Sequence, residues 1–170
     1  SPMKVLSERP GLRYVAGAAL LVLFSQATLE TIFAIWAMNR FGFGPRTVGL
    51  TLFGLASVVV IMQGGVVRAL VPRVGEIRLA VVGVASYVVG LLTVASSPGY
   101  WVTMLGLVFC GIGTGAFTPS ASALASKQAT GADRGSVMGT YQAAGSLARV
   151  IAPFLAGTIY ARVGTWAPFV

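Results

Sequence analysis

The chain has 170 residues, of which 56% are hydrophobic and only 9% are charged, and its mean hydropathy is +0.85. This composition leaves too few polar residues to cover a water-soluble globule, so it excludes a soluble domain and predicts an integral membrane protein. The net charge of +8 comes from Lys and Arg residues dispersed among short segments between apolar runs, and this dispersion argues against a nucleic-acid-binding surface.

Five apolar runs, taken in chain order, predict five transmembrane helices. They cover residues 12–38, 47–70, 78–95, 100–123 and 136–161. Each run is long enough, as a helix, to cross about 30 Å of hydrocarbon. In lipid only a helix satisfies every backbone group within its own segment, so we expect an all-α membrane bundle. Segments rich in turn-forming residues join the runs, at 39–45, 71–75, 96–99 and 129–133.

The distribution of Lys and Arg predicts the orientation of the bundle. The N-terminal segment and the second and fourth joints carry 8 such residues, whereas the first joint and the C-terminal end carry 3. By the positive-inside rule, the N-terminus lies in the cytoplasm.

The residue types that most enzymes need are scarce. There is no histidine, the single cysteine is Cys110, and Asp and Glu together number 4. This removes zinc sites, catalytic triads and most acid–base chemistry from consideration. We therefore expect no enzyme activity, no metal and no cofactor.

Glu30, in the outer part of the first span, is the leading candidate for function. A charge near the bilayer centre costs about 2.5–3.5 kcal/mol on insertion scales, so it normally faces a cavity or a partner. Gln26 lies four residues earlier on the same helical face, and Phe33 and Trp36 lie three and six residues later. These residues suit recognition of an amphipathic or cationic molecule, and desolvation would also favour a protonated Glu30.

Arg149, near the middle of the fifth span, is the second charge at membrane depth. Gln142 and Gly145 share its face, which favours an interface with another helix. Counted from the inner ends of their spans, Arg149 and Glu30 differ in depth by about 7 Å. The alternative for both charges is therefore structural: they form a buried ion pair, and we weight an ion pair or gating role of Arg149 above substrate contact.

The fourth and fifth spans contain helix-breaking residues. Gly111, Gly113, Gly115 and Pro119 fall in the fourth span and Pro153 in the fifth. Without a preceding strand, the glycines do not form a nucleotide-binding motif. They predict close packing and a helix that bends during gating.

Several stretches resemble the major facilitator superfamily. Residues 64–78, with Arg73, Gly75 and Arg78, resemble its Gly-rich basic loop. Residues 111–124, 134–139 and 148–153 are similar to the tenth and eleventh helices of drug:proton antiporters of the tetracycline and multidrug type. Residues 28–38 and 41–49 are similar to the seventh helix and the loop after it.

The resemblance implies a partial six-helix half of a twelve-helix transporter. Residues 12–161 would form helices seven to eleven, residues 1–11 would be the remnant of the cytoplasmic loop between the halves, and residues 162–170 would be an outer loop and the start of a truncated further helix. The N-terminal half of the same protein would then be a partner. The expected location is the bacterial cytoplasmic membrane.

The resemblance also assigns roles to residues. The substrate-cavity candidates are Gln26, Glu30, Phe33, Trp36, Thr114 and Thr118. Arg73, Gly75 and Arg78 would form a gating loop, and Arg149 would lie near the interface between halves. The implied function is proton-coupled efflux of small hydrophobic or amphipathic molecules, with Glu30 exchanging a proton for substrate.

Two other functions stay open. One is a sugar or metabolite facilitator of the same fold, in which Glu30 is purely structural. The other is a non-transporting membrane scaffold or partner-binding bundle.

Overall fold

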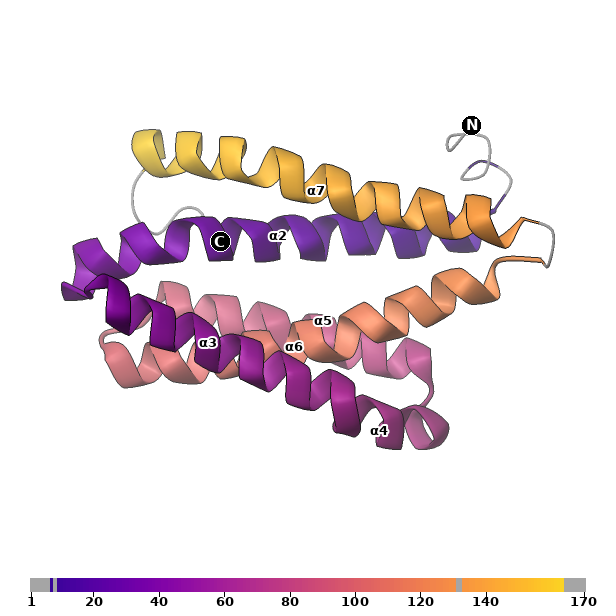
Figure 1. Cartoon of the computed structure of the whole chain (residues 1–170), viewed down its shortest axis with the longest axis horizontal. Coiled ribbons are helices and arrows are strands. Elements are labelled where there is room, and N and C mark those ends of the chain that lie inside the picture. The colour runs from indigo at the N-terminus through magenta and orange to yellow at the C-terminus, as the bar shows by residue number, and fades with distance from the viewer. Residues whose placement is uncertain (1–6, 8, 131–132, 164–170) are drawn as a thin grey trace.

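Every regular element in the computed structural model is helical (Figure 1). The structure describes residues 7, 9–130 and 133–163, with side chains in the last helix up to Thr158. The elements are α2 (Pro10–Phe41), α3 (Pro45–Ile61), the π-helix η1 (Met62–Val66), α4 (Val67–Val74), α5 (Glu76–Ala95), α6 (Tyr100–Lys127) and α7 (Arg134–Val163). The all-α prediction is confirmed. The interpretations of residues 1–6, 8 and 164–170 lie outside the described residues.

The five predicted spans correspond to five helical rods. α3, η1 and α4 run on as one rod, Pro45–Val74, so the prediction of a joint at 71–75 is wrong for all but its last residue. Pro72 lies inside α4, and Gly75 alone makes the turn, with a φ of 84° that favours glycine. Four rods of the described part, α2, α3–η1–α4, α5 and α6, are long and apolar enough to cross a membrane. α7, the fifth, has 30 residues.

The helices form two layers joined by α6. α2 and α7 lie side by side along their length, while α5 and α6 form the most extensive helix pair and α3 packs on α6 (Figure 1). α6 also contacts α2 and α7, so it holds the two layers together.

Glycines allow the backbones of α5 and α6 to touch. Gly83 of α5 lies against Gly113 of α6, and Gly90 lies against Gly106. A Cβ atom added at Gly113 would lie 2.6 Å from the Tyr87 nitrogen and 2.7 Å from the Gly83 carbonyl oxygen. Close approach of this kind replaces hydrophobic burial as the force that joins helices in lipid.

The neighbouring glycines of α6 face α3 and η1. A Cβ atom at Gly111 would meet Val58, and one at Gly115 would lie 2.6 Å from Met62 Cβ. The close-packing expectation for Gly111, Gly113 and Gly115 therefore agrees with the structure. α6 continues as a helix through Pro119, and α7 continues through Pro153. A bending role for these residues stays a prediction.

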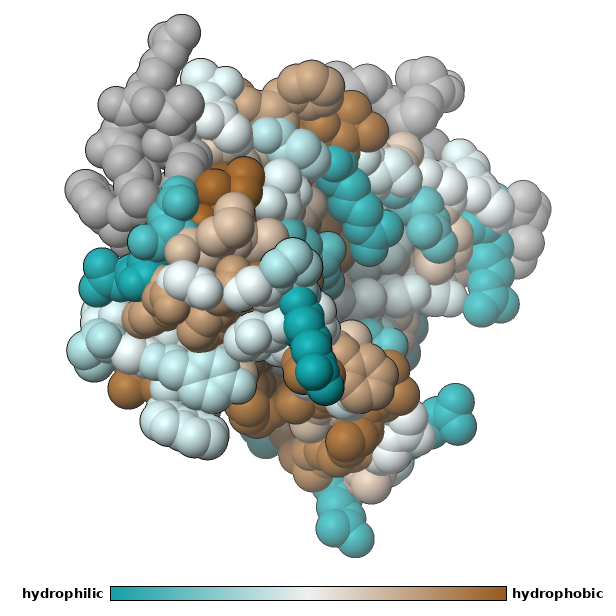
Figure 2. Space-filling model, turned by 60° about the vertical axis from the view of Figure 1, so that its left-hand side comes forward, coloured by the Kyte–Doolittle hydropathy of each residue, from teal (hydrophilic) through white to brown (hydrophobic). Residues whose placement is uncertain are grey.

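Apolar side chains cover much of the outer surface. Exposed examples on five helices are Leu21, Phe53, Val81, Val82, Leu105, Val150 and Phe154. Figure 2 shows one face, on which hydrophilic side chains stand as a few separate groups among hydrophobic and near-neutral ones. Such a surface needs lipid or other protein to cover it, so the chain is an integral membrane protein.

Charged residues link the ends of the helices at the N-terminal end of α2. Lys127, at the end of α6, forms an ion pair with Glu76, at the start of α5, with 2.6 Å between Nζ and Oε1. The Arg9 guanidinium donates to the Gln128 carbonyl oxygen and pairs with Asp133 in the α6–α7 connection. Thr130 donates to the Asp133 carboxylate from its backbone N–H and its hydroxyl, at 2.8 and 3.0 Å.

Asp133 makes this contact sensitive to acid. Partial burial raises its pKa, but the hydrogen bonds from Thr130 and the charge of Arg9 outweigh this and hold the pKa of Asp133 below its ordinary value. A lowered pKa in the folded state gives stability that is complete above the ordinary pKa of about 4 and is lost as pH falls through the folded pKa. We expect Asp133→Asn to speed amide hydrogen exchange at residues 128–130 and 133–137 a few-fold at neutral pH, relative to intrinsic rates, and to remove the extra loss of protection that the unaltered protein shows in acid. Equal exchange in both proteins at every pH would contradict this.

Candidate functional site

Glu30 lies in a pocket of about 420 Å³ between α2, α3 and α6, with Tyr87 of α5 at one side. The Gln26 side-chain amide donates to Glu30 Oε1 at 2.9 Å, which follows from their four-residue spacing on one helix. Apolar side chains of α3 form much of the remaining wall, including Leu52, Leu55 and Val59. A single carboxylate, oriented by an amide, therefore faces a largely apolar space.

α6 supplies two of the less apolar residues of the same pocket. Cys110 and Thr114 line it, four residues apart on one face of the helix. The Thr114 hydroxyl donates to the Cys110 carbonyl oxygen at 3.0 Å, within its own helix. The structure thus brings three of the predicted cavity residues together: Gln26, Glu30 and Thr114.

Phe33 and Trp36 do not line this pocket, so their prediction as cavity residues is wrong for this structure. Phe33 is fully buried and Trp36 is 2% exposed. Their rings pack on each other at 5.9 Å, and Trp36 packs on Phe41. The reason is their position along α2: near its C-terminal end, the turn after Phe41 and the first half of α6 pack over the helix, whereas Glu30 is left open.

Arg149 lies in a second, smaller pocket of about 130 Å³. Its lining comes from α2, α6 and α7: Leu23, Thr118, Ser122, Tyr141, Gln142, Gly145 and Arg149. This pocket combines residues with two predicted roles. Thr118 was predicted to line the substrate cavity, whereas Gln142 and Arg149 were predicted to form an ion pair or a helix interface. Ser122 and Tyr141 were not foreseen, although Ser122 follows Thr118 by one helical turn.

The ion pair expected between Glu30 and Arg149 does not form. No carboxylate oxygen of the described residues lies within 4.0 Å of the Arg149 guanidinium, and the side chain is exposed rather than buried. The two residues line separate pockets: the Glu30 pocket includes side chains of α3 and α5, the Arg149 pocket includes side chains of α7, and no residue lines both.

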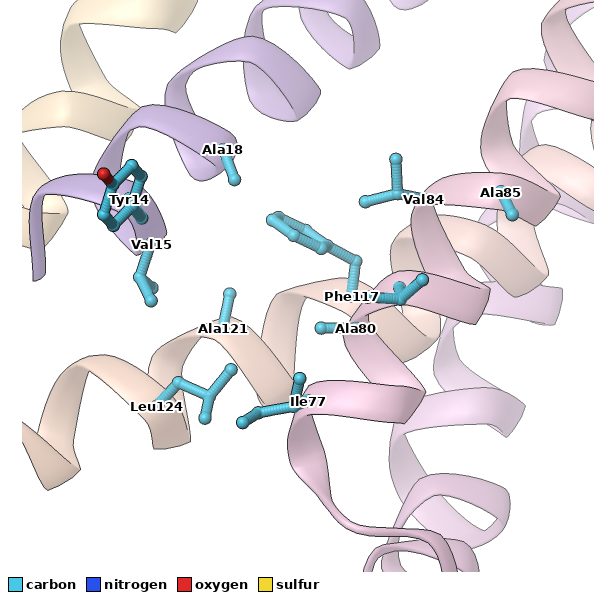
Figure 3. Close-up of a pocket in the computed structure, with 11 residues that line it drawn as sticks. Tyr14, Val15, Ala18, Ile77, Ala80, Val84, Ala85, Phe117, Ala121 and Leu124 are labelled. Carbon is cyan, nitrogen blue, oxygen red and sulfur yellow. The ribbon is translucent and has the colours of Figure 1, made fainter. Parts of the chain in front are cut away.

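A further cavity, of about 460 Å³, is a different kind of space (Figure 3). Tyr14, Val15 and Ala18 of α2 face α5 and α6 across it, and the Phe117 ring points into it. No charged side chain lines it. Its lining is almost entirely apolar, so the candidate functional site is the Glu30 pocket instead.

The expected gating-loop residues lie around the turn between α4 and α5. Arg73 is in the last turn of α4, Gly75 is the turn, and Arg78 is in the first turn of α5. Both arginines are exposed, and the acidic residue between them, Glu76, pairs with Lys127. The gating role stays a prediction. Among the described residues, no group of three or more His, Cys, Asp or Glu side chains is placed to hold a metal ion.

Membrane-length helices with many apolar side chains on their outer surface define an integral membrane protein. The sequence profile of the Major Facilitator Superfamily matches residues 15–170, and the chain belongs to this superfamily.

Two comparisons involve the same human protein. The chain is 26% identical over 158 residues to the Homo sapiens "Major facilitator superfamily domain-containing protein 10", covering 93% of this chain and 34% of that one. A solved structure, "Crystal structure of the human organic anion transporter MFSD10 (TETRAN)", matches with a TM-score of 0.84 and 25% identity, over 93% of this chain and 37% of that one. The chain therefore spans about a third of the length of this relative.

Proposed function

We propose that the chain is part of a secondary transporter that moves small amphipathic molecules across a membrane by alternating access. One observation carries the proposal: Glu30, held by Gln26, faces a pocket of about 420 Å³ whose other walls are largely apolar. An ionisable group inside a membrane-spanning helix and open to a cavity is the usual mark of a substrate or proton pathway.

The proposal includes a second six-helix half. Alternating access works by rocking two halves around a binding site between them, so this chain alone would not transport. The short share of the human relative that the chain covers supports this. So does the second rod, Pro45–Val74, because only 11% of its most apolar window is buried inside the bundle, which leaves it free to contact another half.

Glu30 is proposed as the proton-exchanging residue. It is a carboxylate within a membrane-length helix, it lines the pocket, and it accepts a hydrogen bond from Gln26. Access to the two sides of the membrane in turn would let Glu30 take a proton from one side and release it on the other. Efflux from the cytoplasm of a bacterial cell, with the N-terminus inside, is the direction that we propose.

The substrate class follows from the pocket and from the relative. The pocket is mostly apolar with a few polar groups, which suits an amphipathic molecule rather than a sugar. Because the human relative is described as an organic anion transporter, organic anions join drug-like amphipathic molecules as the first substrates to test.

Transport by the complete gene product, reconstituted in proteoliposomes, tests the proposal. We expect accumulation of substrate against its gradient when a pH gradient is imposed, and loss of that accumulation with an uncoupler. Uptake that is insensitive to the uncoupler would instead show a facilitator. No transport of any substrate, together with a stably bound protein partner, would show a scaffold.

A further inference from the structure

The Arg149 pocket has the size of a head-group site. Its volume of about 130 Å³ is roughly four times the 30 Å³ that one molecule occupies in liquid water. It can therefore hold a small ionic group with its hydration, but not a whole amphipathic substrate. Gln142 and Arg149 are exposed, so the pocket opens at their side.

Hydrogen-bond donors dominate the lining. The guanidinium of Arg149 has five N–H donors, no acceptor, and a charge that is permanent in proteins. Gln142 offers an amide, and Tyr141 a phenol. Asp and Glu are absent from the residues that line this pocket. A site with a fixed positive charge, several donors and no carboxylate of its own favours an anion.

Two hydroxyls of α6 are free to take part. Elsewhere on this helix, Thr114 and Ser120 donate to carbonyl oxygens of their own helix, at 3.0 and 2.8 Å. Thr118 and Ser122 form no such bond within the part of the chain that the structure describes, and both face the pocket. Their hydroxyl hydrogens can therefore point to a ligand oxygen.

An unpaired arginine at this depth needs a partner. A charge at the centre of a membrane helix costs about 2.5–3.5 kcal/mol on insertion scales, and such residues normally pair. The described residues provide no carboxylate within 4.0 Å. A bound carboxylate can accept two parallel N–H bonds from the guanidinium, which is the strongest pairing that this side chain makes.

The two pockets are neighbours along the bundle. Gly145 of α7 and Leu23 of α2 lie at one level, since a Cβ atom on Gly145 would be 2.8 Å from Leu23 Cδ1. At 1.5 Å per residue, Arg149 lies about 6 Å outward from that level and Glu30 about 10 Å. Along α6, one stripe with four-residue spacing serves both pockets: Cys110 and Thr114 line the first, Thr118 and Ser122 the second.

We propose that Arg149, together with Gln142, Thr118 and Ser122, binds the carboxylate of an amphipathic organic anion whose apolar body occupies the Glu30 pocket. This inference rests on the proposed function, because it names the head-group site of the same substrate. It replaces the ion pair with Glu30 that the sequence suggested. The carboxylate neutralises Arg149, and the apolar body contacts Leu52, Leu55 and Val59.

Binding of three matched probes to the purified complete gene product in lipid nanodiscs tests the inference. The probes are 4-phenylbutyrate, 4-phenylbutanamide and 4-phenylbutylamine, which share one apolar body and differ in head-group charge. Thermal unfolding is followed as a function of probe concentration, since a ligand that binds the folded state raises the unfolding temperature. We expect stabilisation by the carboxylate, and weaker or no stabilisation by the other two.

Variants locate the charge that gives this selectivity. Arg149→Gln should weaken carboxylate binding roughly 10- to 100-fold, and Arg149→Lys should weaken it less, because the charge stays but the planar fork is lost. Arg46→Gln removes an equal charge from the exposed start of α3 and should leave binding unchanged. If Arg149→Gln does not fold, Thr118→Val and Ser122→Ala should each weaken carboxylate binding and not amide binding.

Three outcomes would overturn the inference. They are equal stabilisation by all probes or by none, preference for the amine, and carboxylate selectivity that survives Arg149→Gln. The last would mean that a positive group other than Arg149 binds the carboxylate. Because binding is measured without a pH gradient, a failure of proton coupling at Glu30 leaves this result intact, and a failure here leaves proton-coupled transport intact.

Discussion

Replacement of Glu30 by glutamine is expected to abolish accumulation driven by a pH gradient while leaving helix insertion and folding intact. The two side chains have nearly the same shape, so the amide can occupy the same place beside Gln26 in the 420 Å³ pocket. What the change removes is the ability to bind and release a proton. Downhill exchange of substrate, which needs no proton, should persist.

We expect a complete loss of accumulation because no other side chain in the pocket can replace Glu30 as the proton carrier. The pocket contains no second Asp, Glu or His side chain that could carry the proton in place of Glu30. The whole chain has 4 Asp and Glu residues and no histidine. In the Glu30→Gln protein, this pocket would therefore contain no carboxylate or imidazole that could exchange a proton, and a pH gradient could not drive transport through it.

Proteoliposome assays of the complete gene product, with an imposed pH gradient and with labelled substrate on both sides, measure the two activities separately. Asp133→Asn is the matched control, because it makes the same carboxylate-to-amide change in the α6–α7 connection, outside the pocket. It should leave accumulation unchanged. Accumulation by the Glu30→Gln protein equal to that of the unaltered protein would remove Glu30 from the mechanism.

The sequence predicted the polar residues around Glu30 better than it predicted which aromatic residues line the pocket. The hydrogen bond from Gln26 follows directly from four-residue spacing on a helix, and it is present. Phe33 and Trp36 share that general face, but they are buried. Helical spacing specifies direction around the axis, whereas the depth at which the bundle closes depends on the turn after Phe41 and on α6, which are distant contacts.

The Arg149 pocket was beyond sequence reasoning for a related reason. Depth counted along separate spans suggested that Arg149 and Glu30 could meet, but it carried no information on which pocket each side chain lines. Tertiary packing places α7 beside α2 and puts Arg149 towards α6. The π-helix Met62–Val66 likewise has no simple local signal.

The glycines of α5 and α6 carry a signal that spacing alone could have revealed. Gly83 and Gly90 are seven residues apart, and so are Gly106 and Gly113. In two antiparallel helices, equal spacing lets the first glycine of each helix lie against the last glycine of the other. The structure shows both meetings. The sequence predicted close packing and bending for the α6 glycines, but it did not identify the α5 glycines as their packing partners.

Gly113→Ala is therefore expected to destabilise the bundle, and Gly113→Leu to prevent α5 and α6 from packing. The new Cβ would lie 2.6 Å from the Tyr87 nitrogen and 2.7 Å from the Gly83 carbonyl oxygen. Both are backbone atoms, which cannot turn away as a flexible side chain can. Separating the helices would also stretch the hydrogen bond from Ser86 Oγ to the Phe109 carbonyl oxygen, now 3.0 Å. Overpacking of this kind typically costs about 1–3 kcal/mol, and leucine should cost more.

Gly54→Ala provides the control for this prediction. Gly54 lies in α3, and a Cβ atom there would meet nothing within 4 Å. The same substitution should thus be neutral, or stabilising by up to about 1 kcal/mol through helix propensity. Unfolding in detergent, followed by tryptophan fluorescence, gives the free energy of unfolding of each variant. If Gly113→Ala proves as stable as Gly54→Ala, the α5–α6 contact is not set by its glycines, and the bending role for Gly113 becomes the better explanation of why α6 is rich in glycine.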